Sequence, residues 1–228
     1  MGTVFITGAN RGLGLEFVKE FTEKNYKVIA TCRSPNSSSD LSNLAKSHLT
    51  IQMHQLDVSN TKNIQDLSNH LKNEPIDILI NNAGIYRSGS FSSVNKDSWV
   101  ESFVTNTIGP YEVIENFLPN VLQGLEKKIV SITSKMGSID DNSTGGSYIY
   151  RSSKTALNSM MKSLTQDLKI HDISTVTLHP GWVRTDMGGP GGWIDVKESV
   201  SGMINQISNL SLQNTGRYID YAGKPIKW

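Results

Sequence analysis

A tyrosine and a lysine four residues apart are the side chains in this sequence best placed to do chemistry together. Tyr150 and Lys154 begin and end the run Tyr-Arg-Ser-Ser-Lys. On a helix, residues at this spacing share a face, so a phenol and an ammonium can point at one bound molecule. A cation beside the phenol favours the phenolate and lowers the phenol pKa from about 10, which prepares the tyrosine for proton exchange near neutral pH.

The pair does not establish catalysis by itself. The same spacing is common in helices where a tyrosine packs and a lysine is solvated. Tyr148 is a competing phenol, but Ser152, four residues after it, carries no charge. The elements around the pair therefore decide between the catalytic and the structural interpretation.

A glycine-rich turn lies near the amino terminus. Gly8, Gly12 and Gly14 follow a short apolar segment and open a stretch with helical periodicity. Glycines at such a place permit a tight turn and let backbone amides approach a pyrophosphate at the start of the helix. An isolated run of this kind is also common as a plain turn.

Short apolar segments rich in β-branched residues recur along the chain, at residues 4–6, 28–30, 51–53, 76–80, 129–132 and 176–178. Segments with helical periodicity separate them. Alternating strands and helices imply parallel pairing with right-handed crossovers, and nearly continuous apolar strands imply helices on both faces. We predict an α/β fold, a doubly wound parallel sheet of the Rossmann type, with about seven strands, the last near residues 218–220. We expect a single domain over residues 1–228.

The composition narrows the classes of function. The chain has 228 residues, of which 37% are hydrophobic, and this is enough for a continuous core. Its 22 basic and 21 acidic side chains give a formal net charge of +1. This balance provides no electrostatic footprint for nucleic acid or an anionic membrane, so we expect neither as a partner.

Cys32 is the only cysteine, so no internal disulfide can form and the sequence suits a reducing compartment. The amino terminus has no signal-peptide pattern, and no apolar run is long enough for a membrane-spanning helix. The five histidines lack the spacing of metal ligands. We expect a cytoplasmic protein without a metal site.

Four motifs occur in an order that resembles the short-chain dehydrogenase/reductase family over nearly the whole chain. They are Thr-Gly-x-x-x-Gly-x-Gly at 7–14, Asn-Asn-Ala-Gly at 81–84, Ser-x-x-Gly at 134–137 and Tyr-x-x-x-Lys at 150–154. The resemblance implies a nicotinamide cofactor at the carboxyl ends of the strands. The cofactor-binding residues that it implies are Gly8, Asn10, Arg11, Gly12, Leu13, Gly14, Arg33, Asp57, Val58, Asn82, Ala83, Gly84, Tyr150, Lys154, Pro180, Gly181, Val183 and Thr185.

The same resemblance implies a catalytic set of Asn106, Ser134, Tyr150 and Lys154. Ser134 would hydrogen-bond the substrate oxygen, and Lys154 would bind the nicotinamide ribose and lower the Tyr150 pKa together with the positive charge of the oxidised nicotinamide. Asn106 would lie in a disturbed helix, where a water can connect to the lysine. Viewed alone, an asparagine before Gly109 and Pro110 is equally typical of a helix cap or kink.

The end of the second strand selects the adenosine ribose substituent in this family. An acidic residue there would bind a 2′-hydroxyl, but this sequence has Cys32 followed by Arg33. Arg11 adds a second cation, and with no nearby carboxylate the two guanidiniums suit a 2′-phosphate, so we expect NADP(H). The alternative for Arg33 is an ordinary surface cation.

The segments 145–154 and 179–189 resemble the branch that contains sniffer-type carbonyl reductases and C-factor-like signalling proteins. The resemblance implies reduction of a small-molecule carbonyl, an aldehyde or ketone, to an alcohol, with Tyr150 as proton donor. It leaves open a nucleotide-binding signalling protein, whereas an epimerase would usually have a longer carboxyl half.

The branch implies a homodimer or homotetramer, with helices beginning near Asp97 and Ser147 as candidate contacts. Residues 140–146 are expected to form an enlarged loop, and residues 186–199 a partial lid.

Overall fold

The strand order of the sheet is β3-β2-β1-β4-β5-β6-β7, and every neighbouring pair is parallel. The computed structural model describes residues 1–228. Its strands are β1 (Thr3–Ile6), β2 (Lys27–Cys32), β3 (Ile51–Gln55), β4 (Ile78–Asn81), β5 (Lys128–Ile132), β6 (Ser174–His179) and β7 (Arg217–Asp220). The predicted doubly wound sheet of seven strands is confirmed.

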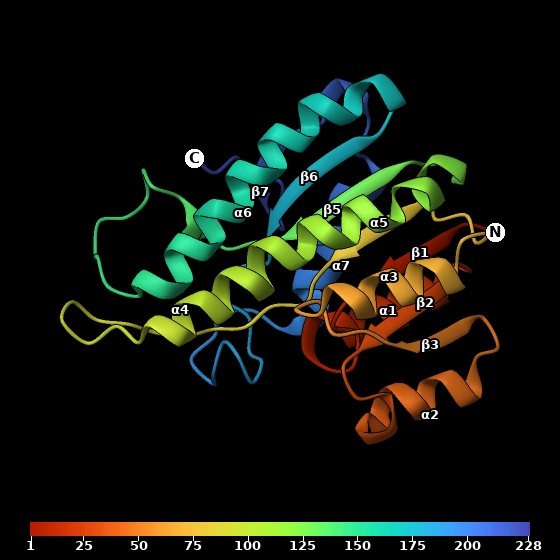
Figure 1. Cartoon of the computed structure of the whole chain (residues 1–228), viewed down its shortest axis with the longest axis horizontal. Coiled ribbons are helices and arrows are strands. Elements are labelled where there is room, and N and C mark those ends of the chain that lie inside the picture. Colours follow the sequence, from red (N-terminus) through yellow and green to blue (C-terminus); the bar gives the residue numbers. More distant parts are fainter.

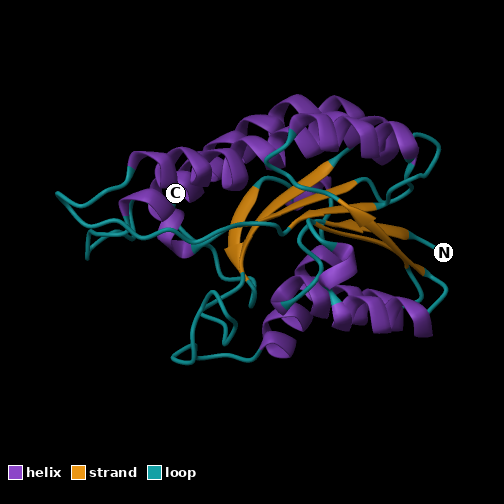
Figure 2. Ribbon diagram, turned by 60° about the horizontal axis from the view of Figure 1, so that its bottom comes forward, coloured by secondary structure: helices purple, strands orange, loops and turns teal.

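Helices cover both faces of the sheet, as Figure 2 shows. The α-helices are α1 (Gly12–Glu23), α2 (Ser39–Ser47), α3 (Thr61–His70), α4 (Lys96–Phe103), α5 (Gly109–Gln123), α6 (Tyr148–Asp167) and α7 (Val196–Ser208). Short turns of helix are η1 (Pro35–Ser37), η3 (Lys135–Gly137), η4 (Leu168–His171) and η5 (Leu212–Asn214), and η2 (Val104–Ile108) is a π-helical turn. Figure 1 places α3, α5 and α6 together on one side.

Two apolar clusters fill the spaces between the sheet and its helices. Successive strand residues point to opposite faces, so Val4 and Ile6 join the cluster under α1 and α7, while Phe5 joins the cluster under α3, α5 and α6. Phe5 packs on Phe117 of α5 with ring centroids 4.4 Å apart. The sheet is therefore buried on both faces, as the apolar strands predicted.

The π-helical turn η2 joins α4 to α5 and has a visible cause in the sequence. Pro110 lacks the N–H that would close an α-helical turn on the Asn106 carbonyl. Gly109 lies so close to the end of the third strand region that an added Cβ would be 2.2 Å from the Val58 carbonyl oxygen. This packing fixes the helix where Asn106 faces the carboxyl ends of the strands.

The order of strands reverses between β1 and β4, because β2 lies on one side of β1 and β4 on the other. In open sheets of this kind a crevice forms there, beyond the carboxyl ends of the strands. No helix combines the length and the apolar character needed to cross a membrane.

Candidate active site

The glycine turn after β1 has the geometry of a cradle for an anion. Gly8 and Gly12 have positive φ angles of 65° and 53°. A Cβ added to Gly14 would lie 2.1 Å from the Gly8 carbonyl oxygen, so only glycine allows α1 to begin this close to the turn. The first turn of α1 has neither a side-chain cap nor an acidic residue. These features fit a pyrophosphate bound by free backbone amides.

The Asn-Asn-Ala-Gly segment fixes this turn from the next strand. The Asn82 side-chain amide donates to the Thr7 and Gly8 carbonyl oxygens at 2.9 and 3.0 Å. Thr7 Oγ1 accepts from the backbone N–H groups of Asn82 and Ala83, each at 3.0 Å. Asn82 is thus bonded to the glycine turn, and its contact with the cofactor remains a prediction.

The two arginines expected beside the adenosine ribose differ in their surroundings. Arg33 is exposed and forms no ion pair. Arg11 Nη1 lies 2.8 Å from a carboxylate oxygen of Asp186. The sequence analysis was wrong that no carboxylate lies near these cations, because Asp186 is distant in sequence and the fold brings its loop to the glycine turn.

The other predicted cofactor residues lie at the same edge of the sheet. Thr185 faces the glycine turn, since a Cβ added to Gly12 would be 3.6 Å from Thr185 Cγ2. Pro180, Gly181 and Val183 follow β6 directly. Asn10 and Leu13 belong to the glycine turn and the start of α1, while Asp57 and Val58 follow β3. One Asp57 oxygen is bonded to Ser59.

Ser134 and Tyr150 lie side by side although they come from different elements. Ser134 follows β5, and its Oγ accepts from the Met136 N–H at 3.2 Å. Tyr150 is in the first turn of α6 and is only 8% exposed. Burial raises the pKa of Tyr150 to about 12, while the Ser134 hydroxyl beside it acts in the opposite direction. The lowered pKa expected from the sequence is not found, because loss of hydration is the larger effect in the chain alone.

Lys154 lies one helical turn after Tyr150 and is almost completely buried. Its Nζ donates to the Ile132 carbonyl oxygen at 2.9 Å and lies 6.0 Å from the centre of the Tyr150 ring. Burial lowers the pKa of Lys154 to about 8. The ammonium is thus held near the phenol at the carboxyl end of β5.

Asn106 is fully buried, and its side chain connects two elements. Its Oδ1 accepts from the Ile85 N–H at 2.8 Å, and its Nδ2 donates to the Ile85 carbonyl at 2.9 Å and to Ser153 Oγ at 3.0 Å. A Cβ added to Gly84 would lie 3.2 Å from Asn106 Oδ1 and 3.6 Å from Lys154 Nζ. The structure therefore brings all four predicted catalytic residues to one place.

Thr133, the neighbour of Ser134, points away from Tyr150, because successive strand residues face opposite sides of the sheet. Its Oγ1 donates to Asn158 Oδ1 at 2.6 Å inside the protein. Tyr148 is 40% exposed and lies away from Lys154 on the helix. Neither of these competing hydroxyls replaces Ser134 or Tyr150.

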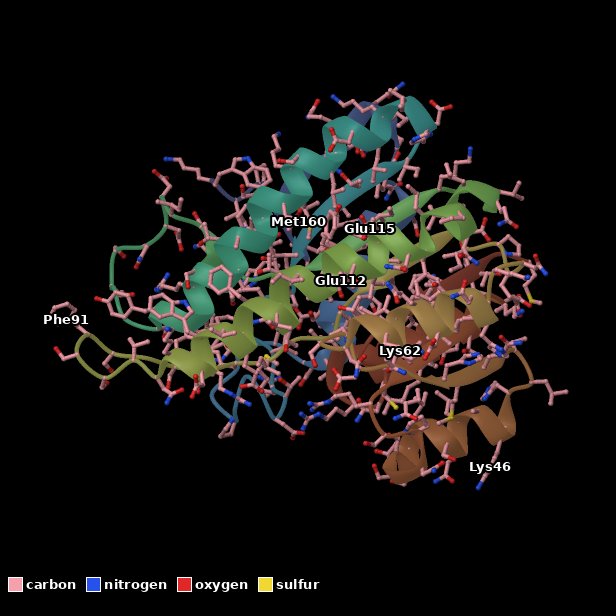
Figure 3. All side chains as sticks on the ribbon, in the orientation of Figure 1. Lys46, Lys62, Phe91, Glu112, Glu115 and Met160 are labelled. Atoms are coloured by element: carbon pink, nitrogen blue, oxygen red, sulfur yellow. The ribbon has the colours of Figure 1, made fainter.

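Tyr86 is a site residue that the sequence analysis missed. Its ring centre lies 4.9 Å from that of Tyr150, and its hydroxyl is 3.2 Å from Ser147 Oγ. It belongs to the segment between β4 and α4, whose outer end carries Phe91, labelled in Figure 3. The only signal in the sequence was its position just after Asn-Asn-Ala-Gly, and this does not specify which side chain it contacts.

The segment predicted as an enlarged loop, residues 140–146, lacks helix and strand as expected. The segment predicted as a lid, residues 186–199, does so only as far as residue 195, because α7 begins at Val196, and the prediction was wrong for residues 196–199. Residues 139–146 contain no helix or strand and are exposed. In residues 186–195, Met187 is 50% and Trp193 78% exposed, and Trp193 packs edge-on against Trp182 at 5.3 Å. No group of three or more histidine, cysteine or acidic side chains lies together as a metal site would require.

Comparisons with known proteins agree with this geometry. A family model described as short chain dehydrogenase matches residues 2–191. The C-signal protein of Myxococcus xanthus is 41% identical over 157 residues, which cover 68% of this chain and 93% of that protein. The carbonyl reductase Sniffer of D. melanogaster superposes with a TM-score of 0.95 at 34% identity over 100% of both chains. An NADPH-bound carbonyl reductase from chicken fatty liver gives a TM-score of 0.93 at 35% identity over 99% of this chain and 98% of that one.

Proposed function

Because the chain belongs to the short-chain dehydrogenase family of oxidoreductases, we propose that it is an NADP(H)-dependent carbonyl reductase that converts an aldehyde or ketone to an alcohol. The observation that carries the proposal is the placement of Tyr150 beside Ser134, with Lys154 one helical turn away. The cradle at Gly8, Gly12 and Gly14 fits the pyrophosphate of the cofactor. The similarity to an NADPH-bound carbonyl reductase supports the choice of cofactor.

The reaction divides between the cofactor and the chain. A bound reduced nicotinamide supplies the hydride that the carbonyl carbon requires. The chain supplies the proton, because burial keeps the Tyr150 phenol protonated at neutral pH and its Oη can donate to the carbonyl oxygen. The Ser134 hydroxyl would donate a hydrogen bond to that same oxygen and hold it beside the phenol.

Lys154 and Asn106 complete the arrangement. The Lys154 ammonium stabilises the negative charge left on Tyr150 after proton donation, since an opposite charge nearby favours the phenolate. The Asn106 side chain is fully used in bonds to Ile85 and Ser153, so we assign it the positioning of α6 against the π-helical turn. A water on the Asn106 backbone carbonyl would connect Lys154 to solvent, so that a solvent proton would return through the ammonium to the Tyr150 phenolate.

The experiment is a spectrophotometric assay of NADPH consumption with a panel of aldehydes, α-dicarbonyls and quinones. We expect at least one compound to be reduced. Tyr150→Phe should retain NADPH binding and lose at least about a hundredfold in kcat, the low end for loss of a general acid. Tyr148→Phe is the matched control and should retain most of the turnover. Near-normal turnover by Tyr150→Phe would contradict the assigned proton donor.

The similarity to the C-signal protein keeps a signalling role as the second candidate. A nucleotide sensor needs only a bound cofactor and an altered surface, whereas hydride transfer needs close alignment of the reacting atoms. Tight NADPH binding without turnover of any panel compound, together with biological activity that survives Tyr150→Phe, would favour signalling.

We also propose that residues 1–228 form one domain, since a single sheet connects β1 to β7 and both apolar clusters extend along it. Pairing of subunits through α4 and α6 is supported by the exposure of Val100 and Tyr148 on these adjacent helices. A reducing compartment such as the cytoplasm suits the buried, unpaired Cys32.

A further inference from the structure

Tyr218 contacts the backbone of Ser134 from the far edge of the sheet. It lies on β7, is 3% exposed, and its hydroxyl donates to the Ser134 carbonyl oxygen at 2.6 Å. Because β6 separates β7 from β5, this bond reaches past a strand to the end of β5. Figure 1 labels these three strands. Any buried tyrosine hydroxyl needs a hydrogen-bond partner. The partner of Tyr218 is notable because it is the backbone carbonyl of Ser134, whose side-chain hydroxyl is proposed to be catalytic.

The turn that carries Ser134 is also fixed by a hydrogen bond within the turn and by two hydrogen bonds from α6. The Ser134 carbonyl also accepts from the Gly137 N–H at 2.8 Å. The Gly137 carbonyl accepts from Thr155 Oγ1 at 2.9 Å and from Asn158 Nδ2 at 3.2 Å. Thr155 and Asn158 are on α6, the helix that carries Tyr150 and Lys154. The turn therefore lies between α6 and Tyr218.

The Tyr218 ring is itself fixed. Trp228 packs against it with ring centroids 5.4 Å apart. The Trp228 carbonyl oxygen accepts from the Asp140 N–H at 3.1 Å, just beyond the serine turn. The phenol thus cannot swing away from Ser134 without displacing this packing.

We propose that Tyr218 is a positioning residue, whose hydroxyl orients the Ser134 peptide so that the Ser134 hydroxyl stays beside Tyr150. The proposal rests on the proposed reductase function, because Ser134 is assigned there to the substrate oxygen. Removal of the Tyr218 hydroxyl leaves Gly137 as a donor to the same carbonyl, so the protein should fold. The peptide then gains freedom to rotate, and small errors in the position of a catalytic group reduce rates strongly.

The first test compares Tyr218→Phe with Tyr26→Phe. Tyr26 is the matched control, since its hydroxyl also makes a 2.6 Å hydrogen bond, to Glu126, at the amino-terminal ends of β2 and β5 and thus away from the proposed site. We expect kcat for carbonyl reduction to fall about tenfold in Tyr218→Phe with the KM for NADPH unchanged, because the change concerns alignment of the serine. Tyr26→Phe should keep its kcat.

A double-mutant cycle separates positioning from general support of the fold. In a Ser134→Ala background, Tyr218→Phe should cause no further loss of kcat, because Tyr218 would act only through the serine hydroxyl. An equal tenfold loss in both backgrounds would overturn the proposal, as would an unchanged kcat in Tyr218→Phe alone.

Amide hydrogen exchange gives a readout that does not need turnover. Tyr218→Phe, but not Tyr26→Phe, should speed exchange at the Met136 and Gly137 amides, which donate to Ser134. Unchanged exchange at these two amides would overturn the proposal. If the unaltered protein reduces no carbonyl, the proposed function fails, and the exchange comparison still decides whether Tyr218 fixes the serine turn.

Discussion

Burial shifts the pKa values of Tyr150 and Lys154, the two ionisable residues of the proposed catalytic set, in opposite directions. It disfavours the charged form of each, and so it raises the pKa of Tyr150 to about 12 and lowers that of Lys154 to about 8. The Tyr150 phenol is therefore protonated over the whole physiological range when no cofactor is bound. The ammonium is the group that titrates within reach of ordinary assays.

The first residue-scale prediction concerns pH. In the chain without cofactor, Lys154 is charged below its pKa of about 8 and neutral above it, so kcat/KM for NADPH should fall as pH rises through about 8. Measurement of kcat/KM for NADPH between about pH 6 and pH 10 at a saturating carbonyl concentration checks this. A kcat/KM that stays level to the upper end would contradict the assigned role of the ammonium.

The lowered pKa of Lys154 affects stability in the opposite direction to activity, because it makes the free energy of unfolding rise with pH. The unfolded chain binds more protons than the folded chain between about 8 and the ordinary lysine value of 10.5, so the Lys154 contribution to the free energy of unfolding rises with pH there. A fall of kcat/KM for NADPH in this window is thus not explained by unfolding that arises from Lys154. Thermal unfolding at each assay pH provides the control.

The second residue-scale prediction concerns the two arginines at the adenosine end. Arg33 is free, whereas the Arg11 guanidinium already contacts Asp186. We expect Arg33→Ala to weaken NADPH binding by about tenfold while NADH binding changes little, since an arginine–phosphate contact is charge-assisted. Arg11→Ala should have the smaller effect. Dissociation constants of NADPH and NADH, measured by calorimetry for both variants, check this prediction. Equal affinity of the unaltered protein for NADPH and NADH would argue against a 2′-phosphate site.

At the scale of elements, the proposed cofactor site depends on how closely the start of α1 approaches the end of β1. Asn82 ties the turn between them to the end of β4 through bonds to Thr7 and Gly8. A change in the backbone of this turn should therefore displace the ends of both β1 and β4.

The prediction at this scale is that Gly14→Ala will impair cofactor binding more than folding. The new Cβ would lie 2.1 Å from the Gly8 carbonyl oxygen, so the turn has to open where the pyrophosphate is expected. We expect NADPH affinity to fall by at least about tenfold. Gly145→Ala is the control, because no atom lies within 4 Å of its added Cβ and the strain from its positive φ of 66° stays in an exposed loop away from the glycine turn. Unchanged NADPH affinity in Gly14→Ala would show that the turn does not bind the cofactor.

At the scale of the whole molecule, the carboxyl edge of the sheet gathers residues from distant parts of the chain. Arg11 meets Asp186, Asn106 meets Ser153, and Tyr218 meets Ser134. The segment that follows β6 and the strand β7 thus both contact residues of the proposed site. A reductase needs this convergence, because its proton donor, serine and cofactor have to meet within hydrogen-bonding distance.

The sequence by itself determined the fold class, the order of strands and helices along the chain, and the candidate residues Ser134, Tyr150 and Lys154. Periodicity and turn residues are local signals, and short motifs preserve the spacing that their chemistry requires. Only the tertiary structure decided the Arg11–Asp186 pair, the packing of Tyr86 on Tyr150 and the bond from Tyr218 to Ser134. Each of these joins residues that no local pattern relates. The sign of the Tyr150 pKa shift likewise depended on burial, which the chain acquires only when α6 packs on the sheet.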